Sequence, residues 1–450
     1  MNVASLLLLL VSLSGVASFS SPPLRGAFHV EGPPLRFDRD GKVILKGMTV
    51  QDITSLMCDL GEANPLIRAK TLAKWMYHID RLAETIEDTK GHSQDRYCFG
   101  KPFRERLSSV ATIDGGLKLS DVRKAPDGTY KLVSTLTDEP ANAANVESVI
   151  IPMLSGPKKQ ERYTLCVSSQ VGCAMNCQFC FTGRMGLLRS LEASQIVEQV
   201  VVAKRYLRSI GDKRDISGVV FMGMGEPGDN AIEVMKALEI MTDPTEGLRL
   251  KSSRITVSTV GVIPFIISFC EARDAGAHKA MLAVSLHAAN ERVRSNIMPL
   301  NNRYPLAELI PVLEKYYPAT GRHIMNVEVT LLKGINDSEA DATALVKLLQ
   351  GVRCVVCISC LQSPNSSAQV KIKWPSFLPC TQVNLITFNP HEGTVFETAT
   401  RQATQLFRAT VMQGGKLCTL RESKGPEDMS ACGQLGDLGG RQAIRVRAAQ

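Results

Sequence analysis

The stretch Cys173-Ala-Met-Asn-Cys177-Gln-Phe-Cys180 decides the fold of this chain. Its three cysteines have the spacing C-x3-C-x2-C. Three thiolates this close together can bind three irons of a cubane [4Fe–4S] cluster, whereas a complete protein shell would supply four. One iron then stays open to a small molecule such as S-adenosylmethionine (SAM). A zinc site is the alternative, but zinc sites usually combine C-x2-C with a second ligand pair elsewhere.

Around this stretch, short apolar runs rich in β-branched residues alternate with helical patterns from residue 163 onward. Six strand–helix units in succession predict parallel β/α winding, and six rather than eight predicts a partial barrel. The fold class is therefore α/β, a partial (β/α)6 TIM-like barrel. Strands are predicted at 163–168, 217–222, 254–259, 281–286, 323–332 and 382–388. Helices are predicted at 192–209, 231–241, 262–275, 306–317, 339–350 and 398–413.

The region before the barrel predicts two smaller units. Residues 45–112 have the pattern of a small helical domain, in which Thr49 caps a first helix and Gly61 ends it. Residues 88–105 are polar and predict a loop. Residues 128–158 predict a short β hairpin that links this domain to the core at 159–426. The last unit, 427–450, is a loop around Cys432 with a basic tail.

The composition is that of a globular protein with a modest positive charge. A chain of 450 residues predicts two or three domains, and 44% hydrophobic residues exclude general disorder. The net charge of +8 fits an anionic partner such as RNA without requiring one. Thirteen cysteines in 450 residues are too few for a disulfide scaffold, and their clustering favours cofactor chemistry in a reducing compartment.

Residues 1–36 have the pattern of a targeting presequence. An apolar run, Ser5-Leu-Leu-Leu-Leu-Leu-Val-Ser12, is too short to span a membrane. The segment from Phe19 to Arg36 is rich in Ser, Pro and Arg and poor in acidic residues, as transit segments are. Together with Ala17-Ser18-Phe19, this predicts import into a complex algal plastid. A mitochondrial or cytoplasmic location is the alternative, and the mature form is expected to have no membrane segment.

The residues that flank the three cysteines resemble the RlmN/Cfr family of radical-SAM RNA methyltransferases. The resemblance covers roughly residues 45–438, and its strings occur in the family's order, which makes them specific together. They are Cys166-Val-Ser-Ser-Gln-Val-Gly-Cys173, Cys180-Phe-Thr-Gly183, Gly223-Met-Gly-Glu-Pro227, Val257-Ser-Thr-Val-Gly261, Ser285-Leu-His287, Asn384-Leu-Ile-Thr-Phe-Asn-Pro390 and Ala431-Cys-Gly-Gln-Leu435. The resemblance independently implies a (β/α)6 radical-SAM core.

The resemblance implies two cofactors, a [4Fe–4S] cluster bound by Cys173, Cys177 and Cys180, and SAM, used twice per turnover. Glu226 would take the SAM amino group, and glycines beside it would let the backbone approach. Several of the implied contacts follow predicted strands at their C-terminal ends, where barrel sites gather. For His287 a buried structural role is the alternative. The implied SAM-binding residues are Gly225, Glu226, Ser258, Ser285, Leu286, His287 and Asn389.

The resemblance also implies three catalytic residues. Cys432 would accept a methyl group and carry it, as a methylene bridge, onto carbon 2 of an adenosine in RNA. Cys166 would then form a disulfide with Cys432 as the product leaves. Glu147 would remove the proton from carbon 2, although an isolated Glu in a hairpin is usually just solvated.

The implied substrate is large-subunit rRNA, with tRNA as a second possibility, and the enzyme is expected to be a monomer that takes electrons from a ferredoxin- or flavodoxin-like donor. Methylation at adenine carbon 8, a glycyl-radical activase and a non-catalytic RNA-binding or ribosome-assembly factor are the alternatives. Phosphate contacts could come from two basic groups. They comprise Arg68, Lys70 and Lys74, and Lys204, Arg205, Arg208, Lys213 and Arg214.

One stretch, residues 353–379, exceeds the family's pattern. It begins with Cys354-Val-Val-Cys357-Ile-Ser-Cys360 and continues with a Ser/Pro-rich run. A second metal site is one interpretation. Because two of these cysteines lie in an apolar run without acids or His, an inserted loop or retained intron sequence is favoured.

Overall fold

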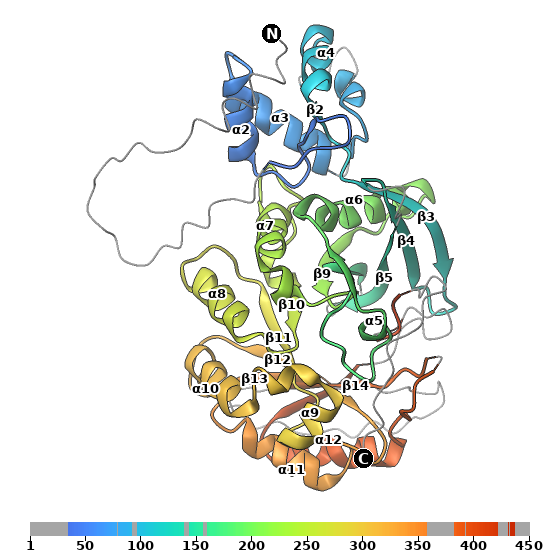
Figure 1. The fold of residues 1–450 in the computed structure, drawn as a ribbon, viewed down its shortest axis with the longest axis vertical. Helices are drawn as coiled ribbons and strands as arrows, with labels where there is room; N and C mark the ends of the chain where they lie inside the picture. Colours follow the sequence, from blue (N-terminus) through green and yellow to red (C-terminus); the bar gives the residue numbers. More distant parts are fainter. Residues whose placement is uncertain are drawn as a thin grey trace, which may run out of the picture.

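The computed structural model describes residues 35–78, 80–91, 97–138, 144–155, 160–357, 382–391, 393–421, 431 and 433–436. A small helical domain forms one end of the molecule (Figure 1). It contains α2 (Val50–Asp59), α3 (Pro65–Tyr77), the 3-10 helix η1 (Ile86–Lys90) and α4 (Lys101–Val110), and β1 (Val43–Ile44) pairs with β2 (Ala111–Thr112). The predicted presequence lies almost entirely outside the described residues.

The predicted cap of the first helix is confirmed, whereas the predicted loop at 88–105 is wrong at both ends. The Thr49 hydroxyl accepts a hydrogen bond from Asp52 N, the Asp52 carboxylate accepts one from Thr49 N, and Gly61 follows the helix at a φ of 71°. Helix α4 is not predicted from the sequence, because Phe103 and Leu107 are its only buried apolar residues and two such residues make no clear helical pattern.

The core is a row of parallel strands wrapped by helices, which confirms the predicted α/β radical-SAM fold (Figure 1). All six predicted strands form within a few residues of their expected bounds. They are β6 (Gln160–Cys166), β9 (Ile216–Phe221), β10 (Ile255–Thr259), β11 (Met281–Ser285), β12 (Met325–Leu331) and β14 (Gln382–Thr387). The sheet also includes β13 (Cys354–Cys357) and β15 (Leu417–Arg421), which were not predicted.

The covering helices follow their strands as predicted. They are α6 (Ala193–Ser209), α7 (Ala231–Thr242), α8 (Ile263–Asp274), α10 (Leu306–Tyr316), α11 (Glu339–Leu348) and α12 (Arg401–Gln413). Two shorter helices, α5 (Phe181–Arg184) and α9 (Glu291–Ile297), lie near the cysteine loop and after β11. No helix among the described residues is long and apolar enough to cross a bilayer.

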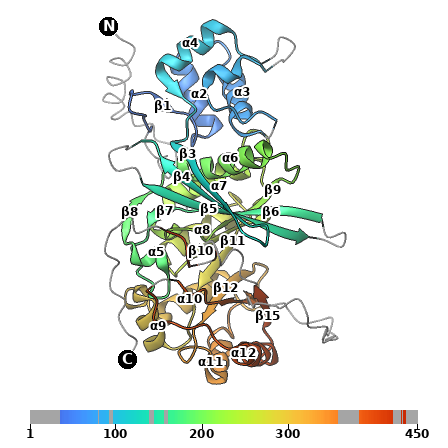
Figure 2. The ribbon, with the colours of Figure 1, turned by 90° about the vertical axis from the view of Figure 1, so that its right-hand side faces the viewer.

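The hairpin is not a separate linker but part of the same sheet as the barrel strands. Strands β3 (Leu117–Lys124), β4 (Tyr130–Leu136) and β5 (Asn145–Ser155) are antiparallel, and β5 pairs with β6 over seven residue pairs. Figure 2 shows these strands running into the barrel. In the described part of the chain, the result is one sheet of eleven strands, in the order β13-β15-β14-β12-β11-β10-β9-β6-β5-β4-β3.

The two predicted basic groups are largely neutralised within the protein. Lys70 and Lys74 both approach Glu246 at 3.9 Å, and Lys204 contacts Asp215 at 2.8 Å. Arg68, Arg205 and Arg214 also form ion pairs with carboxylates. These cations therefore contribute less free positive charge to an RNA surface than the sequence alone implies.

Candidate active site

Most of the predicted cofactor residues line a single cavity at the C-terminal ends of the parallel strands, although Cys173 and Leu286 are not part of its lining. Its volume is about 130 Å³. The strand-end side chains sit where a β/α barrel normally places its site. The lining includes Cys177, Cys180, Gly225, Glu226, Ser258, Ser285, His287 and Asn389, together with Phe179, Glu328, Thr330, Phe388, Gly433 and Leu435.

The three cysteines lie on the loop between β7 (Gln170–Gly172) and helix α5. Cys180 is the N-cap of α5, and its N–H donates to Cys177 O at 3.0 Å. All three are free thiols. Burial raises the pKa of each thiol, and the charges of Cys173 and Cys180 raise that of Cys177 further. Phe179, which lies between Cys177 and Cys180 in the sequence, is 8% exposed and lines the cavity.

Glu226 presents a buried carboxylate at the end of β9. One carboxylate oxygen accepts a hydrogen bond from Gly228 N at 2.8 Å and the other from Val260 N at 2.9 Å. Burial raises the pKa of Glu226 to about 7, against these backbone donors, which lower it. Gly225 precedes it with a φ of 100°, and a Cβ there would lie 2.6 Å from the Gln170 Cβ. Only glycine fits this approach, which brings the Glu226 backbone against β7.

His287 is held as a neutral imidazole just beyond β11. Its Nδ1 accepts a hydrogen bond from Thr330 N at 2.9 Å, which leaves the ring proton on Nε2. Burial lowers the pKa of His287 to about 3. The ring meets Phe179 edge-on at 4.8 Å, and the backbone has a φ of 59°. His287 is therefore both fixed by the core and part of the cavity wall.

The remaining predicted SAM residues fall into two groups. Ser258 is the next-to-last residue of β10, Ser285 is the last residue of β11, and Asn389 lies beyond the end of β14. All three line the cavity. Leu286 differs, because its side chain is fully buried in the core and its N–H donates to Glu328 O at 3.0 Å.

A buried arginine that the sequence analysis missed joins the loops after β10 and β11. Arg294, on α9, is 1% exposed and donates to Val260 O at 2.7 Å and to Leu286 O at 3.0 Å. A third bond goes to Asn301 Oδ1 at 2.5 Å. Burial lowers its pKa to about 10. Arg294 thus fixes the positions of two cavity walls, and no sequence motif marks it.

Glu147 is buried and paired rather than solvated. It is 5% exposed, and its Oε1 lies 2.8 Å from the Lys131 Nζ. Its Oε2 accepts a hydrogen bond from Gly436 N at 2.9 Å. Cys166 is buried at the end of β6. Cys432 lies outside the described residues, but its neighbour Gly433 lines the cavity.

Known proteins with similar sequences carry names that agree with this arrangement of residues. The "Dual-specificity RNA methyltransferase RlmN" of Geotalea uraniireducens is 36% identical over 395 residues, covering 88% of this chain and 96% of that protein. The protein of the same name from Rhodospirillum rubrum is 35% identical, covering 87% and 80%. The chain belongs to the RlmN family. The family model described as "Radical SAM superfamily" matches residues 167–346 of the chain.

A solved structure agrees with the RlmN fold. A radical SAM methyltransferase from Sphaerobacter thermophilus is 32% identical, with a TM-score of 0.70, covering 87% of this chain and 98% of that one. Membership in the RlmN family confirms the predicted enzyme class, a SAM-dependent methyltransferase with an iron–sulfur cluster.

The cysteine loop fits the cluster that an RlmN-family enzyme carries. Within the described ranges, no three His, Cys, Asp or Glu side chains converge as ligands of one metal ion. A cubane places each cysteine on a different iron, so the thiols need not converge on one point. Buried neighbouring thiols that raise one another's pKa need a cationic partner to ionise, and bound iron would supply that charge.

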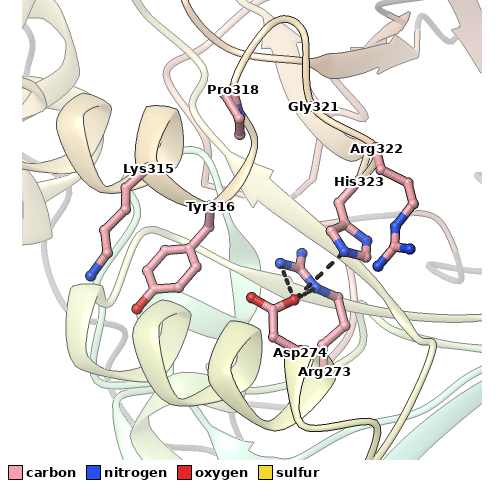
Figure 3. A pocket seen from close by; sticks show the side chains of 8 residues that line it. All are labelled: Arg273, Asp274, Lys315, Tyr316, Pro318, Gly321, Arg322 and His323. Atoms are coloured by element: carbon pink, nitrogen blue, oxygen red, sulfur yellow. Dashed lines mark hydrogen bonds and ion pairs between the residues drawn. The ribbon is translucent and has the colours of Figure 1, made fainter.

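A second, larger cavity lies at the opposite end of the barrel strands. Its volume is about 320 Å³, and Arg322 and His323, which line it, come just before β12. In Figure 3, Asp274 contacts both Arg273 and His323. None of the predicted RlmN residues lies there, so the smaller cavity is the candidate active site.

The stretch 353–379, which exceeds the family's pattern, contributes Cys354 to the hydrophobic core. Cys354 begins β13, is fully buried, and has a pKa raised by burial to about 12. Cys360 and the rest of the predicted insertion to residue 379 lie outside the described residues.

Proposed function

We propose that this chain methylates carbon 2 of an adenosine in RNA, with large-subunit rRNA as the main substrate and tRNA as a second one. The observation that carries this proposal is the shared cavity, which is lined by Cys177, Cys180, Glu226 and Gly433, the residue next to Cys432. RlmN-family relatives named as dual-specificity RNA methyltransferases support it.

The chemistry requires a radical route, because carbon 2 is an electron-poor ring carbon and too weak a nucleophile to attack the methyl group of SAM. When bound, the cluster and SAM supply that one-electron chemistry. Cys173, Cys177 and Cys180 would hold the cluster, and the chain's task is to keep all reactants in register.

The remaining roles belong to residues around this cavity. Glu226 would accept the SAM amino group, while Ser258, Ser285, His287 and Asn389 would orient the rest of SAM. Cys432 would carry the methyl carbon to the adenine. Glu147 would take the proton from carbon 2, and Cys166 would displace the product by forming a disulfide with Cys432. That disulfide has to be reduced before the next turnover.

The target adenine has to reach a buried cavity, so it cannot stay in its base stack. Single-stranded or looped RNA is therefore the expected substrate. The electron donor would be a ferredoxin- or flavodoxin-like protein, and the enzyme would act as a monomer.

The test of this function uses RNA trapped on the protein. Cys166→Ala should accumulate RNA bound covalently through Cys432, seen as a gel shift that survives denaturation. Cys432→Ala should show no adduct, because the bond to RNA cannot form without that sulfur. Normal turnover by Cys166→Ala without an adduct would contradict the role of Cys166. Nucleoside mass spectrometry of the product should find 2-methyladenosine, and 8-methyladenosine would contradict the assigned position.

We also propose that residues 1–36 direct the protein to a plastid. The support is the apolar leader followed by an acid-poor segment rich in Ser, Pro and Arg. A fluorescent fusion of residues 1–40 should enter the plastid in an alga with complex plastids. Fluorescence in the mitochondrion, the cytosol or the medium would contradict the proposal.

A further inference from the structure

The carboxylate of Glu147 connects two parts of the molecule that are far apart in sequence. Oε1 pairs with Lys131 on β4 at 2.8 Å, and Oε2 accepts the N–H of Gly436 at 2.9 Å. Gly436 lies four residues after Cys432. Lys131 and Glu147 have side chains that are 2% and 7% exposed, so water screens this ion pair little.

Strand register places the pair on the same face of the sheet as Cys166. Glu147 lies opposite Val133 and Lys131 lies opposite Val149, so the ion pair is a diagonal contact across β4 and β5. Val149 also lies opposite Cys166 on β6. Opposed residues of antiparallel strands share a face, so Lys131, Glu147 and Cys166 are on the same side of the sheet.

The loop after Cys432 is otherwise attached through neutral groups. Phe181 N donates to Gly433 O at 2.8 Å, and the Thr182 hydroxyl donates to Leu435 O at 2.5 Å. Gly436, at a φ of 134°, packs against α5 so closely that a Cβ would collide with Met185 Sδ. Among the hydrogen bonds that join residues 431 and 433–436 to other described residues, only the one to Glu147 involves an ionisable group.

We propose that Lys131 is a positioning residue, and that its ion pair with Glu147 latches the loop carrying Cys432 until Glu147 has taken its proton. The inference rests on the proposed role of Glu147 as the base. One proton moves from carbon 2 to the Glu147 carboxylate, which becomes neutral. Gly436 N–H then loses its charged acceptor, and the attraction between the charges of Lys131 and Glu147 is lost. The loop is thus held while the RNA bond forms and released once the proton is gone.

The alternative is a buried ion pair that only stabilises the hairpin. In that case, changing its charge would alter stability but not the motion of the loop. The two cases differ in the protection of a single amide, Gly436 N–H, against exchange with solvent.

The experiment is hydrogen–deuterium exchange of the cluster-loaded enzyme, followed by mass spectrometry of peptides that contain Gly436. Glu147→Gln has the shape of the protonated acid and no charge. Hydrogen bonds to charged groups exceed neutral ones by about 1 kcal/mol, so exchange of this amide should accelerate about fivefold. Lys131→Met should accelerate exchange of this amide as well. Lys131→Arg keeps the positive charge and should keep the amide protected, and it is the variant to measure if Lys131→Met does not fold.

The matched control is Arg123→Met, which breaks an exposed ion pair with Asp121 on the neighbouring strand β3. It should leave exchange at Gly436 unchanged. If the Gly436 amide of Glu147→Gln exchanged at the same rate as in the wild type, the latch would be overturned, whether or not RNA adduct accumulates in that variant. Faster exchange without any adduct would instead overturn the role of Glu147 as base and leave the latch in place.

Discussion

At the scale of single residues, burial gives ordinary side chains unusual protonation behaviour. Glu226 has a pKa raised to about 7, whereas His287 has one lowered to about 3. In both cases desolvation is the largest cause, since it opposes the charged form of each group. A bound ligand with a positive amino group would favour the ionised carboxylate of Glu226.

Replacing Glu226 by Gln should weaken SAM binding by at least about tenfold. The charged acceptor for the amino group is lost, and hydrogen bonds to charged groups contribute about 1.5–3 kcal/mol. Calorimetric titration of SAM into the anaerobic, cluster-loaded enzyme measures this. Glu308→Gln, which changes an exposed carboxylate on α10, should bind SAM normally. Equal affinity in Glu226→Gln and wild type would remove Glu226 from the SAM site.

His278 makes a separate, purely structural contribution to pH dependence. It is 5% exposed, its Nε2 contacts Phe269 O at 3.1 Å and its Nδ1 accepts from Ala280 N at 3.2 Å, so both nitrogens are engaged by the neutral ring. Burial lowers its pKa to about 4 from an ordinary value near 6.5.

The sign of this effect follows from proton binding. Between about pH 6.5 and 4 the unfolded chain binds a proton at residue 278 that the folded chain does not, so stability falls as the pH falls through this window. In His278→Asn, the drop in melting temperature from pH 7 to pH 5 should be smaller than in wild type. The same drop in both proteins would show that His278 does not titrate on unfolding.

At the scale of elements, strand positions were predictable, whereas contacts between neighbouring elements were not. The six barrel strands are buried, so their sequences are apolar runs that stand out. Strand β3 was missed because it is a mostly exposed edge strand with charges such as Lys118 and Arg123, and only its pairing with β4 makes it a strand.

The residues of the site likewise divide into those that the sequence predicts and those that it does not. The cysteines, Glu226 and the strand-end residues lie in sequence motifs, and the structure brings most of them to one cavity. Arg294 and Lys131 lie in no motif, since their roles depend on which loops and strands become neighbours. The burial of Glu147 beside Lys131 likewise follows from strand register.

Arg294→Met should destabilise the enzyme by about 2–5 kcal/mol. The change removes the donor to Val260 O and to the buried Asn301 Oδ1, and each unsatisfied group costs about 1–3 kcal/mol. Arg294→Lys should recover less than half of the free energy of unfolding that Arg294→Met loses, because an ammonium cannot reproduce the planar fork of a guanidinium. Urea unfolding measures both. Arg292→Met, exposed on the same helix, should change stability by less than about 0.5 kcal/mol.

At the scale of the whole molecule, a buried ion pair joins the N-terminal domain to the core. Lys46 Nζ lies 2.5 Å from Glu198 Oε2 on α6, and both side chains are almost fully buried. Arg205, also on α6, bonds Glu198 at 2.9 Å and donates to Leu82 O at 3.0 Å. Burial lowers the pKa of Lys46, with the charge of Glu198 opposing that shift.

Glu198→Gln should loosen this junction, because it leaves Lys46 buried without a counter-charge. Breaking a buried pair from one side costs about 3–5 kcal/mol. Limited proteolysis should then cut between the two parts faster than in wild type, and the melting temperature should fall. Glu105→Gln, which breaks the exposed pair with Lys101, should leave both unchanged. Wild-type resistance in Glu198→Gln would show that other contacts hold the domain in place.

The continuous sheet determines where the chain can be shortened. A protein that began at residue 159 would keep every barrel strand but lose β5, the antiparallel neighbour of β6. The seven residues of β6 would then present unpaired N–H and C=O groups along a free edge. Such an edge is a template for adding strands from other molecules and leads to aggregation. Truncations that remain soluble should therefore begin ahead of Leu117, where the sheet has its natural edge at β3.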